Sequence, residues 1–256
     1  GDGADELLAG YDLYRAAAPA SRYRRIPARI RRVIRPVISL AAPDIGGKYT
    51  PREKVARFVY GLEQGECRDH AAWRTVFTRD MKKAIYTPEF FHETREFDPL
   101  EPYAQLVREV RCQGGSVLRS LLYADLRFYL PNQMLVKVDR MSMAHGLEVR
   151  VPFLDNEVVD FCWRLPDICR VRGKRGKYLL RKLISDCYPE ALARRPKSGF
   201  TIQSGVPAKK FWSDENLVQS NIDLRRIPSF TRFHRFLQWY LLAILSRTHF
   251  PKGHNR

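Results

Sequence analysis

The chain has 256 residues, of which 45% are apolar and 12% aromatic, enough to bury a core, and this composition excludes an intrinsically disordered protein. Its formal charge of +17 indicates an anionic partner, and nucleic acid, a membrane surface and phosphorylated small molecules all qualify. No apolar run approaches the roughly 20 residues that cross a bilayer, and no signal peptide is recognisable. We therefore expect a soluble, cytoplasmic protein with no membrane partner.

The cysteines favour reduced thiols. There are five, and no two form a C-x-x-C pair, which argues against a zinc site and a disulfide framework. Cys162 and Cys187 lie on apolar stripes and are expected in the core.

Apolar residues at helical spacing predict a mostly helical chain. In chain order, the expected helical stripes cover residues 55–62, 103–110, 118–129, 135–138, 158–163, 179–187 and 233–245. The third stripe is expected to end at Pro131, so that Asn132 caps a new helix closed by Gly146, and Asp155 is expected to cap the helix that follows. Short strands are predicted at 147–153 and 169–173.

An arginine-rich segment covers residues 15–38. It could bind nucleic acid or anionic lipid through its basic face. A solvated helix flank is the favoured interpretation, because one tyrosine among the arginines is too few for a base-stacking platform.

The opening segment, GDGADELLAGY, combines glycines with clustered carboxylates. Glycines allow the backbone to approach a ligand closely, and carboxylates beside backbone N–H groups suit Mg²⁺ bound to a polyphosphate. Asp5 and Glu6 could instead simply cap a helix, but this alternative leaves Asp2, between two glycines, unexplained.

Two further stretches carry clustered cations. In LPNQMLVKVDRMSMAHGLEVRVPFLD, Lys137 and Arg140 share a helix face, and their apolar neighbours predict partial burial, which would require an anion. Glu148 and Arg150 are expected to form an ion pair.

The later stretch, residues 173–200, places Lys177, Arg181 and Lys182 on an apolar-striped helix. The loop RRPKSGF follows, in which Pro196 and Gly199 form a stiff turn that can aim Lys197.

GDGADELLAGY, LVKVDRMSMAHGLEVRVPFLD, KYLLRK and RPKSGF, in that order, resemble the synthetase domain of glutamine-hydrolysing asparagine synthetases. The resemblance covers essentially the whole chain. It implies a mostly α structure: the C-terminal helical portion of an α/β adenine-nucleotide alpha-hydrolase-like (PP-loop ATP-pyrophosphatase) domain. No S-G-x-D-S phosphate loop occurs, so residues 1–256 are expected to be a partial synthetase domain, lacking the upstream PP-loop half and an N-terminal glutaminase, and inactive alone.

The resemblance implies a ligase that uses ATP and Mg²⁺. Aspartate, or another carboxylate, would be adenylated with release of pyrophosphate, and ammonia from a glutaminase domain would then displace AMP. The complete protein could form a homodimer.

The resemblance also implies roles for individual residues. Asp2, Lys137 and Lys197 would be catalytic, and Asp5 would hold the metal ion. The ATP contacts would come from Gly1, Asp2, Gly3, Lys137 and Lys197.

The stretch 201–212 departs from the family pattern, which leaves the acceptor open. Alternatives are an amidotransferase, or a macrolactam or β-lactam cyclase, that acts on another carboxylate. A basic helical nucleic-acid-binding protein is the alternative of a different class, and it leaves the lysine-bearing motifs unexplained.

Overall fold

The computed structural model of the chain describes residues 1–27, 29–31, 51–75, 78–173 and 175–195 and two short strands at 218–219 and 222–223. This part is mostly helical, as expected, and its strands form two antiparallel pairs. The chain divides into two compact units. The first contains Gly1–Val37, Arg57–Trp73 and Pro99–Gly199, and the second contains Ile38–Ala56, Arg74–Asp98 and Phe200–Arg256.

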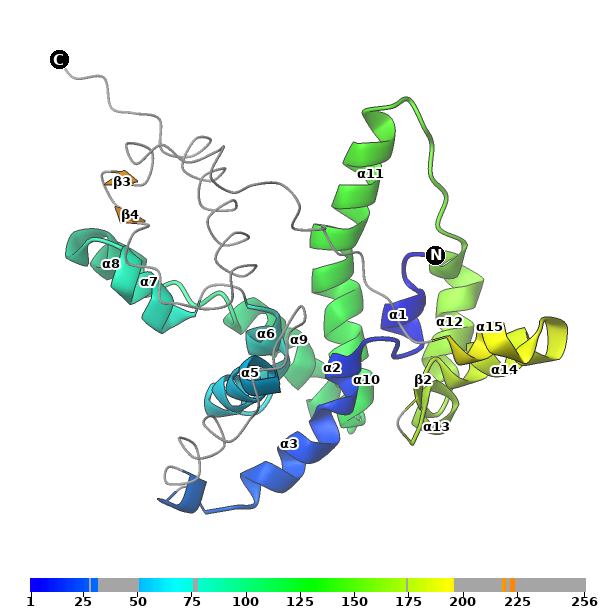
Figure 1. Ribbon diagram of the computed structural model, residues 1–256, viewed down its shortest axis with the longest axis horizontal. Coiled ribbons are helices and arrows are strands. Elements are labelled where there is room, and N and C mark those ends of the chain that lie inside the picture. The colour runs from blue at the N-terminus through cyan, green and yellow to red at the C-terminus, as the bar shows by residue number, and fades with distance from the viewer. Residues whose placement is uncertain are drawn as a thin grey trace. The chain divides into compact units, whose positions relative to one another are not determined.

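The first unit holds most of the helices (Figure 1). Its α-helices are α1 (Ala4–Leu7), α2 (Asp12–Arg15), α3 (Ala17–Arg24), α6 (Asp69–Arg74, whose last residue belongs to the second unit), α9 (Glu101–Cys112), α10 (Val117–Ala124), α11 (Val136–Met143), α12 (Asn156–Arg164), α13 (Asp167–Arg170), α14 (Tyr178–Cys187) and α15 (Glu190–Arg194). A 3₁₀ turn, η2, covers Pro152–Leu154, and β1 (Val171–Arg172) pairs with β2 (Arg175–Gly176). Helix α5 (Pro51–Glu63) begins in the second unit and ends in the first.

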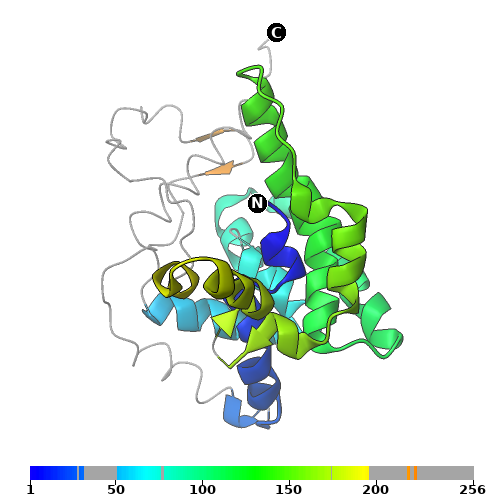
Figure 2. The ribbon, with the colours of Figure 1, turned by 90° about the vertical axis from the view of Figure 1, so that its right-hand side faces the viewer.

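One long helical column runs through α10, a π-helix η1 (Asp125–Leu135) and α11. Figures 1 and 2 show it in green, with α12 alongside. The predicted break at Pro131 is therefore wrong, and Asn132 is inside the π-helix, where its amide donates to the carbonyl of Phe128 at 2.7 Å. The wider π turn has i→i+5 hydrogen bonds and accommodates a residue that has no N–H to donate.

The column ends where the sequence predicted. Gly146 takes a positive φ of 65°, and the N–H of Leu147 bonds to the carbonyl of Ser142 at 3.0 Å. This is the hydrogen-bonding arrangement of a glycine-terminated helix.

A buried polar group holds the centre of the first unit. The Asp125 carboxylate, fully buried, accepts hydrogen bonds from Tyr14 at 2.5 Å and Tyr103 at 2.9 Å, and lies 3.1 Å from Nε2 of His70. The imidazole of His70 stacks between the two tyrosine rings. This group joins α2, α6, α9 and the π-helix, so it fixes the chain directly after the opening glycine-rich segment.

A second anchor lies where α12 ends. Arg170 is 1% exposed, and its guanidinium donates to the carbonyls of Leu7 at 3.2 Å and Leu165 at 2.5 Å. It also donates to the carbonyls of Cys162 and Trp163, at the last turn of α12. The arginine therefore satisfies carbonyls at a helix end and ties α1 to that end.

The other predicted helices and strands can be compared with the structure one by one. Helices at 55–62, 103–110, 158–163 and 179–187 are confirmed, and the Asp155 carboxylate caps α12 by accepting from the N–H of Glu157 at 2.9 Å. The strand predicted at 169–173 is confirmed only at Val171–Arg172, which form β1, because Cys169 and Arg170 belong to α13. The strand predicted at 147–153 is wrong, since its proline starts the 3₁₀ turn and removes a ladder donor. The expected helix at 233–245 lies outside the described residues.

One of the two cysteine predictions is confirmed, and so is the predicted ion pair. Cys162 is buried between α1 and α12 as expected, but Cys187 is exposed at the end of α14, so its placement in the core is wrong. Glu148 and Arg150 do form an ion pair.

The described part of the arginine-rich segment forms α3 and a short turn after it. Arg22, Arg25 and Arg29 are exposed there, which agrees with a solvated helix flank. Among the helices that the structure describes, none has the length and apolar character to cross a membrane.

The described part of the second unit contains α7 (Arg79–Ile85), α8 (Pro88–Thr94) and the strand pair β3 (Val218–Gln219) and β4 (Ile222–Asp223). The hydroxyls of Thr78 and Thr87 cap the two helices.

Candidate functional site

The opening segment, GDGADELLAGY, folds into a turn, the single-turn helix α1 and a loop that leads to α2. Gly1 and Gly3 lie against the side chains of Phe153 and Leu154, which belong to the 3₁₀ turn η2. The end of the motif LPNQMLVKVDRMSMAHGLEVRVPFLD therefore packs on the first residues of the chain. Asp2, in the turn before α1, is partly exposed.

The structure pairs Asp5 with Lys177. The Lys177 ammonium lies 2.9 Å from Oδ1 of Asp5, and the two side chains are only 21% and 14% exposed. Lys177 adopts the left-handed conformation, with φ 55°, between β2 and α14. Its backbone N–H donates to the carbonyl of Leu8 at 2.9 Å, which fixes the lysine against the loop that follows α1.

Two glycines make this pairing possible through close approach. A Cβ on Gly10 would lie 1.8 Å from Oδ1 of Asp5 and 2.4 Å from Cε of Lys177. A Cβ on Gly176 would lie 2.1 Å from the carbonyl oxygen of Ala9. Both distances are far below van der Waals contact. A side chain at Gly10 would displace the side chains of Asp5 and Lys177, and one at Gly176 would force the backbone of Ala9 away.

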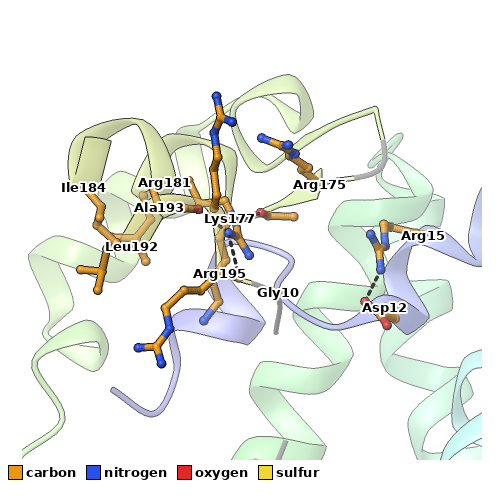
Figure 3. Close-up of a pocket in the computed structure, with 13 residues that line it drawn as sticks. Gly10, Asp12, Arg15, Arg175, Lys177, Arg181, Ile184, Leu192, Ala193 and Arg195 are labelled. Carbon is orange, nitrogen blue, oxygen red and sulfur yellow. Dashed lines mark hydrogen bonds and ion pairs between the residues drawn. The ribbon is translucent and has the colours of Figure 1, made fainter. Parts of the chain in front are cut away.

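A cavity of about 520 Å³ opens beside this pair. Figure 3 shows its lining, which comes from Gly10 and helix α2 and from the segment 175–195, which contains β2, α14 and α15. The lining cations are Arg15, Arg175, Lys177, Arg181, Arg194 and Arg195, and Leu180, Ile184 and Leu192 add apolar surface. Among the described lining residues the only acid is Asp12, which pairs with Arg15.

Arg181 shapes the cavity by holding the backbone. Its guanidinium donates to the carbonyl of Gly176 at 3.1 Å, of Ala193 at 2.5 Å and of Arg195 at 3.0 Å. The residue therefore fixes the chain immediately before the RPKSGF loop. The cavity has a net positive lining, which favours an anionic ligand.

The two carboxylates of α1 lie in its first turn, and each also has a partner from elsewhere in the chain. Asp5 pairs with Lys177, whereas Glu6 is buried and accepts a hydrogen bond from the hydroxyl of Tyr11 at 2.7 Å. Desolvation raises the pKa of Glu6, and the hydrogen bond from Tyr11 opposes this shift in part. The place of Asp5 and Glu6 in the first turn agrees with the alternative interpretation that they serve the start of the helix, and the contacts with Lys177 and Tyr11 are additional.

Lys137 lies in the first turn of α11, directly after the π-helix, and its ammonium is 3.6 Å from the sulfur of Met134. Lys137 and Arg140 are exposed, so the predicted partial burial is wrong. The physical reason is that their apolar neighbours do not cover them: Met141 and Met143 are themselves 63% and 59% exposed.

Lys197 lies outside the described residues, and the last described residue before it, Arg195, lines the cavity. Asp5 is therefore connected to the cavity wall by its ion pair with Lys177, a residue to which the sequence analysis assigned no role. The convergence of Asp2, Lys137 and Lys197 on the same anion stays a prediction.

The donors at the site suit a metal that shares its ligands with a substrate. No group of three His, Cys, Asp or Glu side chains in the described part of the chain is placed to hold a metal ion. Asp5 offers a carboxylate, the type of hard oxygen ligand that Mg²⁺ accepts singly or in pairs while phosphate oxygens and water complete its shell. The site fits Mg²⁺ that arrives with a polyphosphate.

Sequence reasoning noted Lys177 and Arg181 but gave neither a role. The available signal was their position, since both follow Gly176 at the start of an apolar-striped helix. Their partners, Asp5 and the backbone near residue 195, could not be read from local sequence.

Comparison with known proteins matches the family model described as asparagine synthase over residues 1–240. Asparagine synthetase [glutamine-hydrolyzing] 1 of Bacillus subtilis (strain 168) is 28% identical over 207 residues, which cover 79% of this chain and 30% of that protein. Asparagine synthetase [glutamine-hydrolyzing] 3 of the same organism is 37% identical over 82 residues, 32% of this chain and 13% of the relative.

An asparagine synthetase [glutamine-hydrolyzing] of Gallus gallus is 39% identical over 93 residues, 34% of this chain and 16% of the relative. The chain spans about a third or less of the length of these curated relatives. No solved structure matches the chain. The ordered motifs, the helical fold and the match over residues 1–240 lead to one conclusion: the chain belongs to the asparagine synthase family.

Proposed function

We propose that this chain is part of an ATP-dependent, glutamine-hydrolysing asparagine synthetase, and that residues 1–256 are the C-terminal helical portion of its PP-loop ATP-pyrophosphatase domain. The observation that carries the proposal is the Asp5–Lys177 pair at the edge of a cation-lined cavity, in a chain matched by the family model over residues 1–240.

The proposed reaction has two steps. A side-chain carboxylate oxygen of aspartate attacks the α-phosphorus of ATP, and the bond from that phosphorus to the bridging oxygen of pyrophosphate breaks. Ammonia, released from glutamine by a glutaminase domain, then attacks the activated carbonyl carbon. The carbon–oxygen bond to AMP breaks, and Asp2 accepts the proton that ammonia loses.

The cavity meets the main electrostatic demand of the first step. Negative charge develops on the leaving pyrophosphate, and fixed cations that face it stabilise the transition state without rearranging during the reaction. Lys177, Arg175 and Arg195 supply such charges. Mg²⁺ held in part by Asp5 would neutralise phosphate charge further.

The remaining roles extend the proposal to residues whose convergence is untested. Lys137 and Lys197 would face the phosphates, and the backbone at Gly1 and Gly3 would contact the nucleotide. We further propose a cytoplasmic enzyme whose complete form can be a homodimer.

Pyrophosphate release in the intact protein tests the function. Wild type is assayed with ATP, Mg²⁺, aspartate and glutamine, beside Lys197→Ala and the control Lys182→Ala, which removes an exposed lysine of α14. Lys197→Ala is expected to lose on the order of 100-fold in synthesis, as for loss of a transition-state donor, and to keep glutamine hydrolysis. Unchanged synthesis in Lys197→Ala would exclude its role, and no ATP turnover with any carboxylate would exclude the function.

The acceptor needs a separate experiment, because the stretch 201–212 departs from the family pattern. A panel of carboxylates is screened for ATP-dependent pyrophosphate release. Release with aspartate supports an asparagine synthetase, whereas release only with another carboxylate identifies a related amidotransferase or a cyclase. Tight, steeply salt-dependent binding to nucleic acid without turnover would favour the alternative of a basic nucleic-acid-binding protein.

A further inference from the structure

We propose that Lys177 is a positioning residue whose ammonium group pairs with the Asp5 carboxylate while the site is empty. When the nucleotide binds, the ammonium group moves to the polyphosphate, so that metal binding at Asp5 depends on nucleotide binding. This inference rests on the proposed function, since it requires a polyphosphate in the cavity. It gives a role to a contact that neither the sequence motifs nor the comparisons assign.

The backbone of Lys177 is held in place independently of its ammonium group. Its N–H donates to the carbonyl of Leu8 at 2.9 Å, and its φ of 55° places it between β2 and α14. The close contact of Gly176 with the carbonyl of Ala9 fixes the preceding residue. The side chain can therefore exchange partners without any change in the fold.

The surroundings of the ammonium distinguish it from a structural cation. Arg170 is 1% exposed, and its guanidinium is surrounded by carbonyls of the protein itself. Lys177 is 21% exposed and lines the cavity, so its ammonium can reach either Asp5 or an anion that enters. A purely structural pair has no need to lie on the wall of a cavity lined by other cations.

Lys177 and a metal ion compete for the Asp5 carboxylate because both are positively charged. While Lys177 lies 2.9 Å from Oδ1 of Asp5, a metal ion that arrives alone must displace a cation from the same carboxylate. A bound polyphosphate offers the ammonium new oxygens, and Asp5 then becomes available to the metal. By linkage, nucleotide and metal must raise each other's affinity by the same factor.

Metal affinity without nucleotide is the first test. Mn²⁺ binding to the intact protein is followed by electron paramagnetic resonance for wild type, Lys177→Met, Lys177→Arg and the control Lys182→Met. Lys177→Met should bind Mn²⁺ roughly tenfold more tightly than wild type, because a partly exposed ion pair no longer competes. Lys177→Arg, which keeps the charge, should stay nearer wild type. Equal Mn²⁺ affinities in Lys177→Met and Lys182→Met would overturn the proposal.

Nucleotide affinity is the second test. ATP binding is measured by calorimetry in EDTA and in Mg²⁺. Lys177→Met should bind ATP in EDTA about tenfold more weakly, since one phosphate contact of a charged group is lost. Asp5→Asn, which releases Lys177 from its carboxylate partner, should bind ATP in EDTA more tightly than wild type.

The two tests separate this inference from the proposed function. If the wild-type protein binds no ATP in either condition, both this inference and the proposed function are refuted. A wild-type protein that binds ATP with Mg²⁺, while Lys177→Met matches Lys182→Met in both tests, removes only the role of Lys177. Thermal unfolding of each variant identifies any that fail to fold, and Asp5→Asn then tests the exchange with the lysine still in place.

Discussion

Replacing Arg170 with methionine tests whether one buried cation connects the candidate site to the end of α12. Methionine fills much of the same volume but cannot donate to the carbonyls of Leu7 and Leu165, which now accept hydrogen bonds from the guanidinium. The carbonyl of Cys162 loses the guanidinium but keeps the N–H of Leu165 as a donor. The exposed Arg164, in the last turn of the same helix, provides the control Arg164→Met.

The expected loss is large for a single substitution. Each buried carbonyl that loses its donor costs about 1–3 kcal/mol, so we expect a loss of about 3–5 kcal/mol for the carbonyls of Leu7 and Leu165 together. A domain has a total free energy of unfolding of about 5–15 kcal/mol, so the loss is a substantial part of it. For a protein of this size it corresponds to a fall in melting temperature of roughly 6–20 °C. Arg170→Lys should lie between wild type and Arg170→Met, because one ammonium cannot reach all of these carbonyls.

The measurement is the urea midpoint and melting temperature of wild type and the three variants, followed by circular dichroism. A difference below about 0.5 kcal/mol between Arg170→Met and Arg164→Met, the usual range for surface substitutions, would refute the reasoning. It would mean that water reaches these carbonyls and that the guanidinium is not needed to satisfy them.

Three further predictions follow from single contacts. Burial raises the pKa of Glu6 above its ordinary value of 4.5, so the contribution of this group to stability is complete below pH 4.5 and is lost as pH rises through the folded-state pKa. Urea midpoints measured between pH 4 and 8 should therefore fall for wild type but not for Glu6→Gln. Parallel curves for the two proteins would show that Glu6 does not cause the pH dependence. Gly10→Ala puts a Cβ 1.8 Å from Oδ1 of Asp5 and should lower the unfolding free energy by about 1–3 kcal/mol and weaken Mg²⁺-dependent ATP binding; unchanged calorimetry and melting would contradict the packing described. Tyr14→Phe removes a buried donor to Asp125 and should cost about 1–3 kcal/mol in urea unfolding, and a neutral effect would show that the carboxylate finds another donor.

Features that depend on neighbouring residues were predicted from sequence. The helical stripes that became α5, α9, α12 and α14, the capping of α12 by Asp155 and the helix end at Gly146 all follow from patterns within a few residues. The order of the four motifs likewise identified the family, which the match over residues 1–240 confirms.

Features that depend on distant partners were not predicted. Pro131 reads locally as a helix end, yet the column continues through it as a π-helix. Cys187 lies on an apolar stripe, but it ends α14 at an exposed position. In both cases the local rule was insufficient: the π turn accommodates Pro131, and no other described element covers Cys187.

The candidate site shows the same division. The sequence by itself determined which charged residues are present, their order and the family to which they belong. Only the tertiary structure decided that Asp5 pairs with Lys177, that Glu6 is buried, and that Lys137 is exposed. The reason is physical: helix periodicity and capping act over three or four residues, whereas ion pairing and burial depend on which distant segments the folded chain brings into contact.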